Sequence, residues 1–174
     1  MARSNLSRVA YRRRREHKTN YRRREKLLLS GLPRAVVRKS LGNMQVQIIE
    51  YDMEGDRIRV SAHSRELLKL GWKFGRGNIP AAYLTGLLAG AKAKNAGITR
   101  TVPDFGLQVV KAGNRLYAAV KGIMDAGIDI PVSPEVIPSE DRLSGKHVAG
   151  HLKQAAGIDA SISETKKKIL EGRK

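Results

Sequence analysis

GNIPAAYLTGLLAGAKAKNAG, residues 77–97, carries the strongest helix pattern in this 174-residue chain. Asn78 can cap the N-terminus of the helix, Pro80 suits its first turn, and Gly97 can end it. Apolar side chains recur at helical spacing and define the face that we expect to be buried. The residues of that face are Leu84, Leu87, Leu88 and Ala91.

Gly86 and Gly90 lie inside this helix pattern and carry a further prediction. Each glycine lowers helix propensity by about 1 kcal/mol relative to alanine, so the positions are expensive unless they serve packing. Residues four apart lie on the same face of a helix. We therefore expect a flat stripe at these glycines, where the backbone of another element approaches closely.

The residues before the helix show the alternation of apolar and polar side chains that is typical of strands. We expect strands over Arg34–Ser40, Met44–Tyr51 and Arg57–Ala62, with turns at Gly42-Asn43 and Asp52–Asp56. This order predicts an antiparallel meander with one buried face and one open face that carries arginine. In the last strand, the side chains expected on the buried face are Ile58, Val60 and Ala62.

Strand and helix patterns continue after the long helix. Short strands are expected over Ile98–Val102 and Gly106–Lys111, and a strand or extended segment over Ile128–Val132. A second helix is expected over Asn114–Ala126, with Gly127 as its end. Strands and helices in this order predict the α/β class, with a mixed β-sheet packed with helices.

Composition divides the chain into a basic arm at residues 1–26, an α/β body at 27–132 and a C-terminal extension at 133–174. A hydrophobic fraction of 41% is enough to give the body its own core. The extension is richer in proline, serine and charge, so we expect it to be irregular apart from a short helix over Ser163–Glu171.

The arm holds half of the excess positive charge of the chain. The formal net charge is +18, and eleven cationic residues against two glutamates give the first 26 residues +9. Such a segment repels itself until a polyanion supplies counter-charge, and each neutralised phosphate releases condensed counterions. We therefore expect nucleic acid to order the arm, with Tyr11 and Tyr21 stacking on exposed bases. The arm's candidate contacts are Arg3, Arg8, Tyr11, Arg12, Arg13, Arg14, Arg15, Lys18, Tyr21, Arg22, Arg23 and Arg24.

The loop Leu70–Asn78 combines glycine, cationic and aromatic residues directly before the long helix. Its glycines allow close approach of a backbone, and the free N–H groups at the helix start favour phosphate. Lys73 and Arg76 offer charge, whereas Trp72 and Phe74 either stack on a ligand or belong to the core. Upstream, Ser64 is expected to cap a short helix over Arg65–Leu70.

The remaining patterns argue against an enzyme. The chain has no cysteine, which removes disulfides, thiolate zinc sites and thiol nucleophiles. His147 and His151 are four residues apart but lack further ligands, so we expect no metal site. Carboxylates are too sparse in the body for two-metal chemistry, and we expect neither catalytic residues nor a cofactor. No apolar run is long enough to cross a bilayer, so we expect no membrane partner.

Several segments stand out together: RRRRE (12–16) with KTNY (18–21), VSAHSREL (60–67), GNIPAAYLTGLLAG (77–90), DFGLQ (104–108) and PSEDR (138–142). They resemble the archaeal form of the large-subunit ribosomal protein L18 family. The resemblance spans nearly the whole chain, and YLTG (83–86) is its most specific part. It implies a ribonuclease H-like sandwich without catalytic acids, with an extended basic N-terminal arm.

The resemblance also implies a function. It points to a structural constituent of the large ribosomal subunit, bound to the ribosome in the cytoplasm. The expected partners are 5S ribosomal RNA, its attachment site on 23S ribosomal RNA at the central protuberance, and neighbouring large-subunit proteins such as the ribosomal L5 family. The arm from Arg3 to Arg24, with Asn20, would contact RNA. The body residues placed at RNA are Arg34, Arg38, Lys39, Arg57, Arg59, His63, Ser64, Arg65, Lys73, Arg76 and Asn78.

Other interpretations of the sequence stay open at this point. A free RNA-binding protein or RNA chaperone would not co-sediment with the large ribosomal subunit. A degenerate nuclease on the same fold would cleave RNA with magnesium and would depend on Asp52 or Asp104, although we expect no such cleavage.

Overall fold

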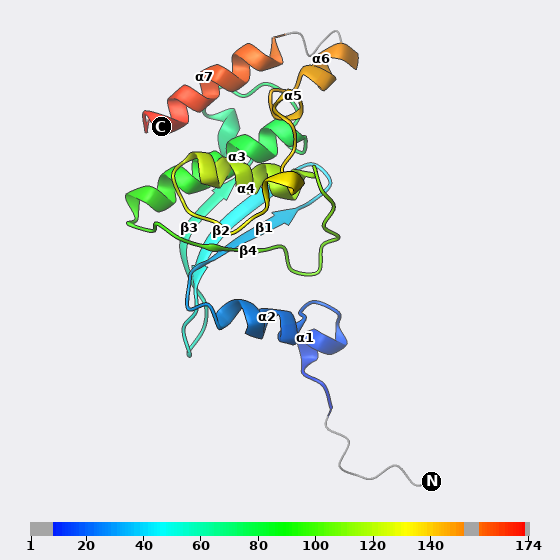
Figure 1. Cartoon of the computed structure of the whole chain (residues 1–174), viewed down its shortest axis with the longest axis vertical. Coiled ribbons are helices and arrows are strands. Elements are labelled where there is room, and N and C mark those ends of the chain that lie inside the picture. Colours follow the sequence, from blue (N-terminus) through cyan, green and yellow to red (C-terminus); the bar gives the residue numbers. More distant parts are fainter. Residues whose placement is uncertain (1–8, 152–156, 173–174) are drawn as a thin grey trace.

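A mixed β-sheet with the strand order β3-β2-β1-β4 forms the centre of the molecule. The computed structural model describes residues 9–151 and 157–172. The predicted antiparallel meander and the α/β class are confirmed, because β1, β2 and β3 are antiparallel neighbours and β4 lies parallel to β1 (Figure 1). The strands are β1 (Arg34–Lys39), β2 (Met44–Glu50), β3 (Arg57–His63) and β4 (Val102–Asp104).

The helices α3 (Ile79–Asn95) and α4 (Arg115–Asp125) pack on one face of this sheet (Figure 1). Asparagine begins each of them: Asn78 accepts the N–H of Ala81 at 2.9 Å, and Asn114 accepts the N–H of Leu116 at 2.9 Å. Both predicted helices are thus confirmed. The strand side chains buried beneath them are Ala35, Val37, Met44, Val46, Ile48, Val60 and Ala62.

The predicted stripe of small residues on α3 is confirmed as the contact with α4. A Cβ atom at Gly86 would overlap the backbone oxygen of Ala119, and a Cβ atom at Gly122 would overlap the backbone oxygen of Tyr83. A Cβ atom at Gly90 would lie 2.5 Å from the Cβ atom of Ala126, the residue that follows α4. The glycines of both helices therefore let the two backbones touch, which side chains would prevent.

β3 departs from the predicted alternation at its start. A register shift between Ile48 and Ile49 of β2 pairs Ile49 with Ile58. A shift of one residue moves side chains to the opposite face, so Ile58 lies on the open face and is 55% exposed. The prediction that Ile58 faces the core is wrong, whereas Val60 and Ala62 are buried as predicted.

Ser64 has a different role from the one predicted. Its hydroxyl is buried at the end of β3, where it accepts the N–H of Met44 at 3.1 Å and lies 3.3 Å from the amide oxygen of Asn43. The following 3₁₀ turn, η1 (Glu66–Leu68), has no side-chain cap. The prediction of a Ser64 cap is wrong, because the hydroxyl is already used across the hairpin.

Residues 106–111, predicted as a strand, form a turn and a loop after β4. The side chain of Gln108 replaces strand pairing: it donates to the backbone oxygen of Lys39 at 3.0 Å and accepts the N–H of Lys39 at 3.3 Å. The predicted segment Ile128–Val132 is extended and joins the sheet region through a bridge between Arg100 and Asp129.

The C-terminal extension contains more regular structure than we predicted. Its final helix begins at Ile158 instead of Ser163, and its side chains Ile162 and Ile169 are buried in the core. The Lys166 ammonium lies 5.6 Å from the centre of the Tyr83 ring of α3. The extension therefore completes the layer over α3. Its elements are η2 (Pro134–Val136), α5 (Glu140–Leu143), α6 (Lys146–His151) and α7 (Ile158–Leu170).

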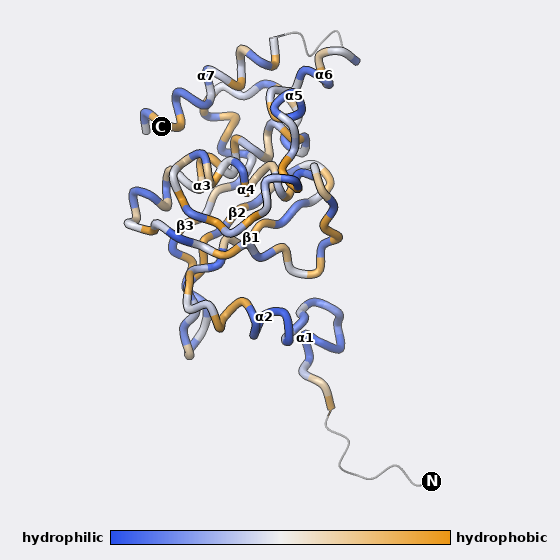
Figure 2. Tube along the Cα trace, in the orientation of Figure 1, coloured by the Kyte–Doolittle hydropathy of each residue, from blue (hydrophilic) through white to orange (hydrophobic). Residues whose placement is uncertain are grey.

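The arm projects from the body at the end opposite to α7 (Figure 1). It forms α1 (Arg12–Arg15) and α2 (Tyr21–Leu28), and its ribbon is mostly hydrophilic (Figure 2). Asn20 caps α2 by accepting the N–H of Arg23 at 3.1 Å. The expectation that RNA orders the arm stays a prediction; the structure gives residues 12–15 and 21–28 a helical conformation. The predicted contacts Arg3 and Arg8 lie outside the described residues.

Gly86→Ala is expected to destabilise the fold by about 1–3 kcal/mol, because the added methyl group overlaps the backbone of α4. Urea unfolding followed by the fluorescence of Trp72, the one tryptophan of the chain, measures the change. Gly42→Ala is the control, since a Cβ atom at Gly42 meets nothing within 4 Å. Equal stability of the two variants would contradict the close helix contact.

Candidate nucleic-acid interface

Asp56, at the end of the turn between β2 and β3, joins the arm to the body. Its carboxylate accepts hydrogen bonds of 2.8 and 3.0 Å from Arg24 of α2. It also accepts a bond of 2.6 Å from Arg34 of β1. A bidentate guanidinium–carboxylate pair fixes orientation as well as distance. Arg24 therefore holds α2 in a defined position on the body.

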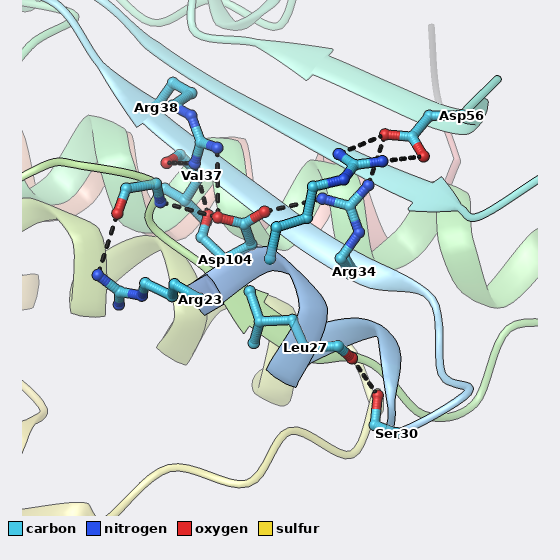
Figure 3. A network of polar contacts seen from close by, with 10 residues as sticks. Arg23, Leu27, Ser30, Arg34, Val37, Arg38, Asp56 and Asp104 are labelled. Carbon is cyan, nitrogen blue, oxygen red and sulfur yellow. Dashed lines mark hydrogen bonds and ion pairs between the residues drawn. The ribbon is translucent and has the colours of Figure 1, made fainter. Parts of the chain in front are cut away.

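Asp104, the last residue of β4, binds the other side of the Arg34 guanidinium. One carboxylate oxygen accepts a bond of 2.9 Å from Arg34, and the second lies 3.3 Å from Arg38 and accepts the N–H of Gly106 at 2.8 Å. Arg38 also donates to the backbone oxygen of Asp104 at 2.6 Å. Side chains thus join β4 to β1 in addition to strand pairing (Figure 3).

Arg23 attaches α2 at a second point. Its guanidinium donates to the backbone oxygen of Gly106 at 3.0 Å, and the N–H of the same glycine is bound by Asp104. Arg23 and Arg24 therefore both bind groups that are connected to Arg34: Arg24 binds Asp56, and Arg23 binds Gly106, which is held by Asp104. We call this network the arm latch; its members are Arg23, Arg24, Arg34, Asp56 and Asp104.

The carboxylates of the arm latch are ionised. Partial burial raises the pKa of Asp56, but the hydrogen bond from Arg24 and the charge of Arg34 outweigh it, so this pKa lies below its ordinary value. Burial likewise raises the pKa of Asp104, and the charge of Arg38 with the N–H of Gly106 brings it below its ordinary value. The negative charges therefore persist at neutral pH beside the most basic part of the chain.

Arg34 is a structural cation. Successive side chains of a strand point to opposite faces of the sheet. The Arg34 side chain therefore lies on the face opposite to that of Ala35 and Val37, which α3 and α4 cover. Arg34 is nevertheless only 3% exposed, and it lines a pocket together with Leu27 of α2. The predicted contact of Arg34 with RNA does not fit this position, because its terminal nitrogens are used by Asp56 and Asp104.

The outer surface of the arm is exposed and cationic. Glu16 pairs with Lys18 at 2.9 Å and with Arg12 at 3.9 Å. Tyr11 is 73% exposed, and its ring centre lies 5.2 Å from that of Tyr21. Adjacent guanidinium groups beside an exposed aromatic face suit contact with phosphates and bases. The exposed cations are Arg12, Arg13, Arg14, Arg15, Lys18, Arg22, Arg23 and Lys26.

Arg57 and Arg59 lie at the exposed start of β3. Arg57 pairs with Asp52 at 2.6 Å, and Arg59 lies 3.6 Å from Glu50. Ion pairs between exposed side chains contribute at most about 1 kcal/mol, so a phosphate can displace the acidic partner. These cations remain open to nucleic acid.

The end of the β1–β2 hairpin brings further predicted residues together. Arg38, Lys39 and His63 line one small pocket there. His63 accepts the N–H of the exposed Arg65 at 3.1 Å on its Nδ1 atom. Ser64 is buried beneath them, so its predicted contact with RNA does not fit this position.

The loop before α3 resolves the two interpretations of its aromatic residues. Trp72 is 1% exposed and belongs to the core, and the Phe74 ring packs edge-on against it at 5.3 Å. Lys73 is exposed and Arg76 is half-buried, so both reach the surface. The side chain of Asn78 is used as the cap of α3, which leaves its amide oxygen engaged.

In residues 9–151 and 157–172, no group of three or more histidine and carboxylate side chains could hold a metal ion. The two acids that the nuclease hypothesis needs are used elsewhere: Asp52 pairs with Arg57, and Asp104 pairs with Arg34. In the same ranges, no helix has the length and apolar character to span a membrane.

Local sequence does not place Asp56 and Asp104 at this site. The pattern around Asp56 is typical of a solvated turn, and its partner Arg24 is 32 residues away. Asp104 and Arg34 are 70 residues apart and meet only because β4 pairs with β1. The available signal was an acid beside basic strand residues, which local sequence does not distinguish from ordinary surface charge.

Comparison with known proteins gives a consistent result. A family model described as "Ribosomal large subunit proteins 60S L5, and 50S L18" matches residues 6–99, which include most of the arm, the meander and α3. A relative from Korarchaeum cryptofilum (strain OPF8), named "Large ribosomal subunit protein uL18", is 52% identical over 167 residues. That alignment covers 94% of this chain and 86% of the relative.

Acid is expected to release α2 from the body. Because the folded-state pKa values of Asp56 and Asp104 lie below the unfolded value of about 3.9, the latch stabilises the arm fully above that pH and loses its effect as the pH falls through the folded-state values. Amide exchange of residues 21–28, compared between about pH 5 and pH 2.5, measures this release. Protection of α2 that persists as long as that of α3 would contradict it.

Proposed function

Because the chain belongs to the family of the large-subunit ribosomal proteins L5 and L18, we propose that it binds 5S ribosomal RNA and helps to attach that RNA to 23S ribosomal RNA at the central protuberance. Members of this family are structural components of the large subunit and not enzymes. The protein would act bound to the ribosome in the cytoplasm. Its further partners would be neighbouring large-subunit proteins, including the ribosomal L5 family.

The observation that carries this proposal is the exposed cationic arm, held at a defined position beside the body. The arginines of α1 have exposed side chains, whereas Arg24 at the base of the arm is bound by Asp56. Exposed guanidinium groups at a fixed place can match the phosphates of a folded RNA, which is recognised mainly by its shape and backbone. Tyr11 and Tyr21 would stack on unpaired bases.

The residues that the sequence predicted at RNA fall into an outer set, which we propose to contact it, and a supporting set. Members of the outer set have side chains that reach the surface. In the described residues this set comprises Tyr11, Arg12, Arg13, Arg14, Arg15, Lys18, Asn20, Tyr21, Arg22, Arg23, Arg38, Lys39, Arg57, Arg59, His63, Arg65, Lys73 and Arg76. The supporting set, Arg24, Arg34, Ser64 and Asn78, has side chains engaged within the protein and holds the outer residues in place.

Replacing Arg12, Arg13, Arg14 and Arg15 together with glutamine is expected to weaken binding to 5S ribosomal RNA strongly. Each lost phosphate contact lowers the slope of log affinity against log salt by about 0.7–0.9, so the slope should become shallower by roughly 3. Filter-binding titrations at several salt concentrations measure both quantities.

The control variant removes the same charge from exposed cations far from the arm in sequence, Lys69, Lys94, Arg142 and Lys167. Its salt slope should change much less, because general attraction falls equally while the arm contacts remain. Equal slopes for the two variants would refute the role given to α1.

A further inference from the structure

We propose that Asp56 is a positioning residue for RNA binding: its carboxylate holds α2 on the body, so that the arginines of α1 meet RNA already oriented. This inference rests on the proposed function and adds to it a role for an acid inside the most basic region of the chain.

The side-chain contacts of Asp56 join the arm helix α2 to strand β1 of the sheet. Its carboxylate binds Arg24 through two hydrogen bonds and Arg34 through a third, and the Asp56 side chain is only 26% exposed. Arg34 is fixed in turn by Asp104 of β4. A motion of α2 away from the body must therefore break the bidentate pair at Asp56.

The position of α2 is passed on to α1 by local contacts. Tyr11 directly precedes α1 and Tyr21 is the first residue of α2, and their ring centres lie 5.2 Å apart. The Arg13 guanidinium of α1 donates a hydrogen bond of 2.9 Å to the hydroxyl of Thr19, which lies between α1 and α2. Fixing α2 at Asp56 therefore also restricts the directions that the α1 arginines can take.

If Asp56 acted through its charge alone, its removal would have the opposite effect on RNA binding. A carboxylate close to RNA repels phosphates, so removing it should strengthen binding and leave the arm function intact. The arm latch predicts that removal weakens binding, because RNA then selects the oriented arm from a mixed population and the apparent affinity falls with the oriented fraction. The two explanations differ in sign, and one measurement separates them.

The test compares Asp56→Asn with Glu54→Gln in the full chain. Each variant removes one negative charge from the same turn, but the Glu54 side chain is exposed and forms no ion pair with the described residues. Titration with 5S ribosomal RNA should show Asp56→Asn binding about tenfold more weakly than the wild type. Glu54→Gln should bind as tightly as the wild type or slightly more tightly.

Further readouts separate positioning from loss of the fold. Amide exchange of residues 21–28 should accelerate in Asp56→Asn, while the α3 amides and the urea midpoint reported by Trp72 stay unchanged. Asp56→Glu should restore both slow exchange and affinity, because a carboxylate again faces Arg24. If Asp56→Asn lowers the urea midpoint, Arg24→Gln tests the same idea with the Asp56–Arg34 pair intact. It must weaken binding more than Arg22→Gln, which removes an exposed arginine from the same helix.

Binding of Asp56→Asn that equals or exceeds that of the wild type would overturn the inference, as would an Arg24→Gln effect no larger than that of Arg22→Gln. A wild-type chain that fails to bind 5S ribosomal RNA would overturn the proposed function instead. In that case the amide exchange of α2 still reports whether Asp56 holds the arm.

Discussion

The Arg34 guanidinium, buried between the carboxylates of Asp56 and Asp104, is the interaction on which the arrangement of arm and body depends. Its side chain is 4% exposed, and a charge so deep in a protein is tolerated only when it is paired. Breaking a buried pair by removing one partner costs about 3–5 kcal/mol in other proteins. The partners come from the β2–β3 turn and from β4, so one side chain fixes an edge strand, a turn and, through the shared Asp56, the arm helix.

The apolar core and the arm latch lie on opposite faces of the same sheet, which separates folding from the placement of the arm. On the core face, α3 is buried by the sheet, by α4 and by the C-terminal helix α7. Contact through Gly86 and Gly122 brings the α3 and α4 backbones together and leaves no gap for side chains between them. The other face carries Arg34 and Arg38, whose charges hold α2 and β4 without contributing to that core.

Periodicity predicted the helices and strands that are defined by local sequence. It failed where contacts between distant residues determine the position of a side chain or segment. The caps at Asn78 and Asn114 and the alternation in β2 are visible in neighbouring residues. The exposure of Ile58 depends on a register shift, which no single strand reveals. For the interface, the cationic arm was predictable from charge, but its attachment was not, because Arg24 and Asp56 are joined only by the tertiary fold.

Basic composition by itself therefore does not define the surface that meets RNA. A guanidinium group binds a carboxylate and a phosphate with the same planar geometry. Acids placed within the fold decide which arginines are already bound and which stay free. In this chain Asp56 and Asp104 engage the arginines at the base of the arm and in β1, while those of α1 keep exposed side chains. The carboxylates near the arm thus determine which arginines are bound within the protein and where the exposed ones lie. A count of positive charges alone would assign Arg34 and Arg12 the same role.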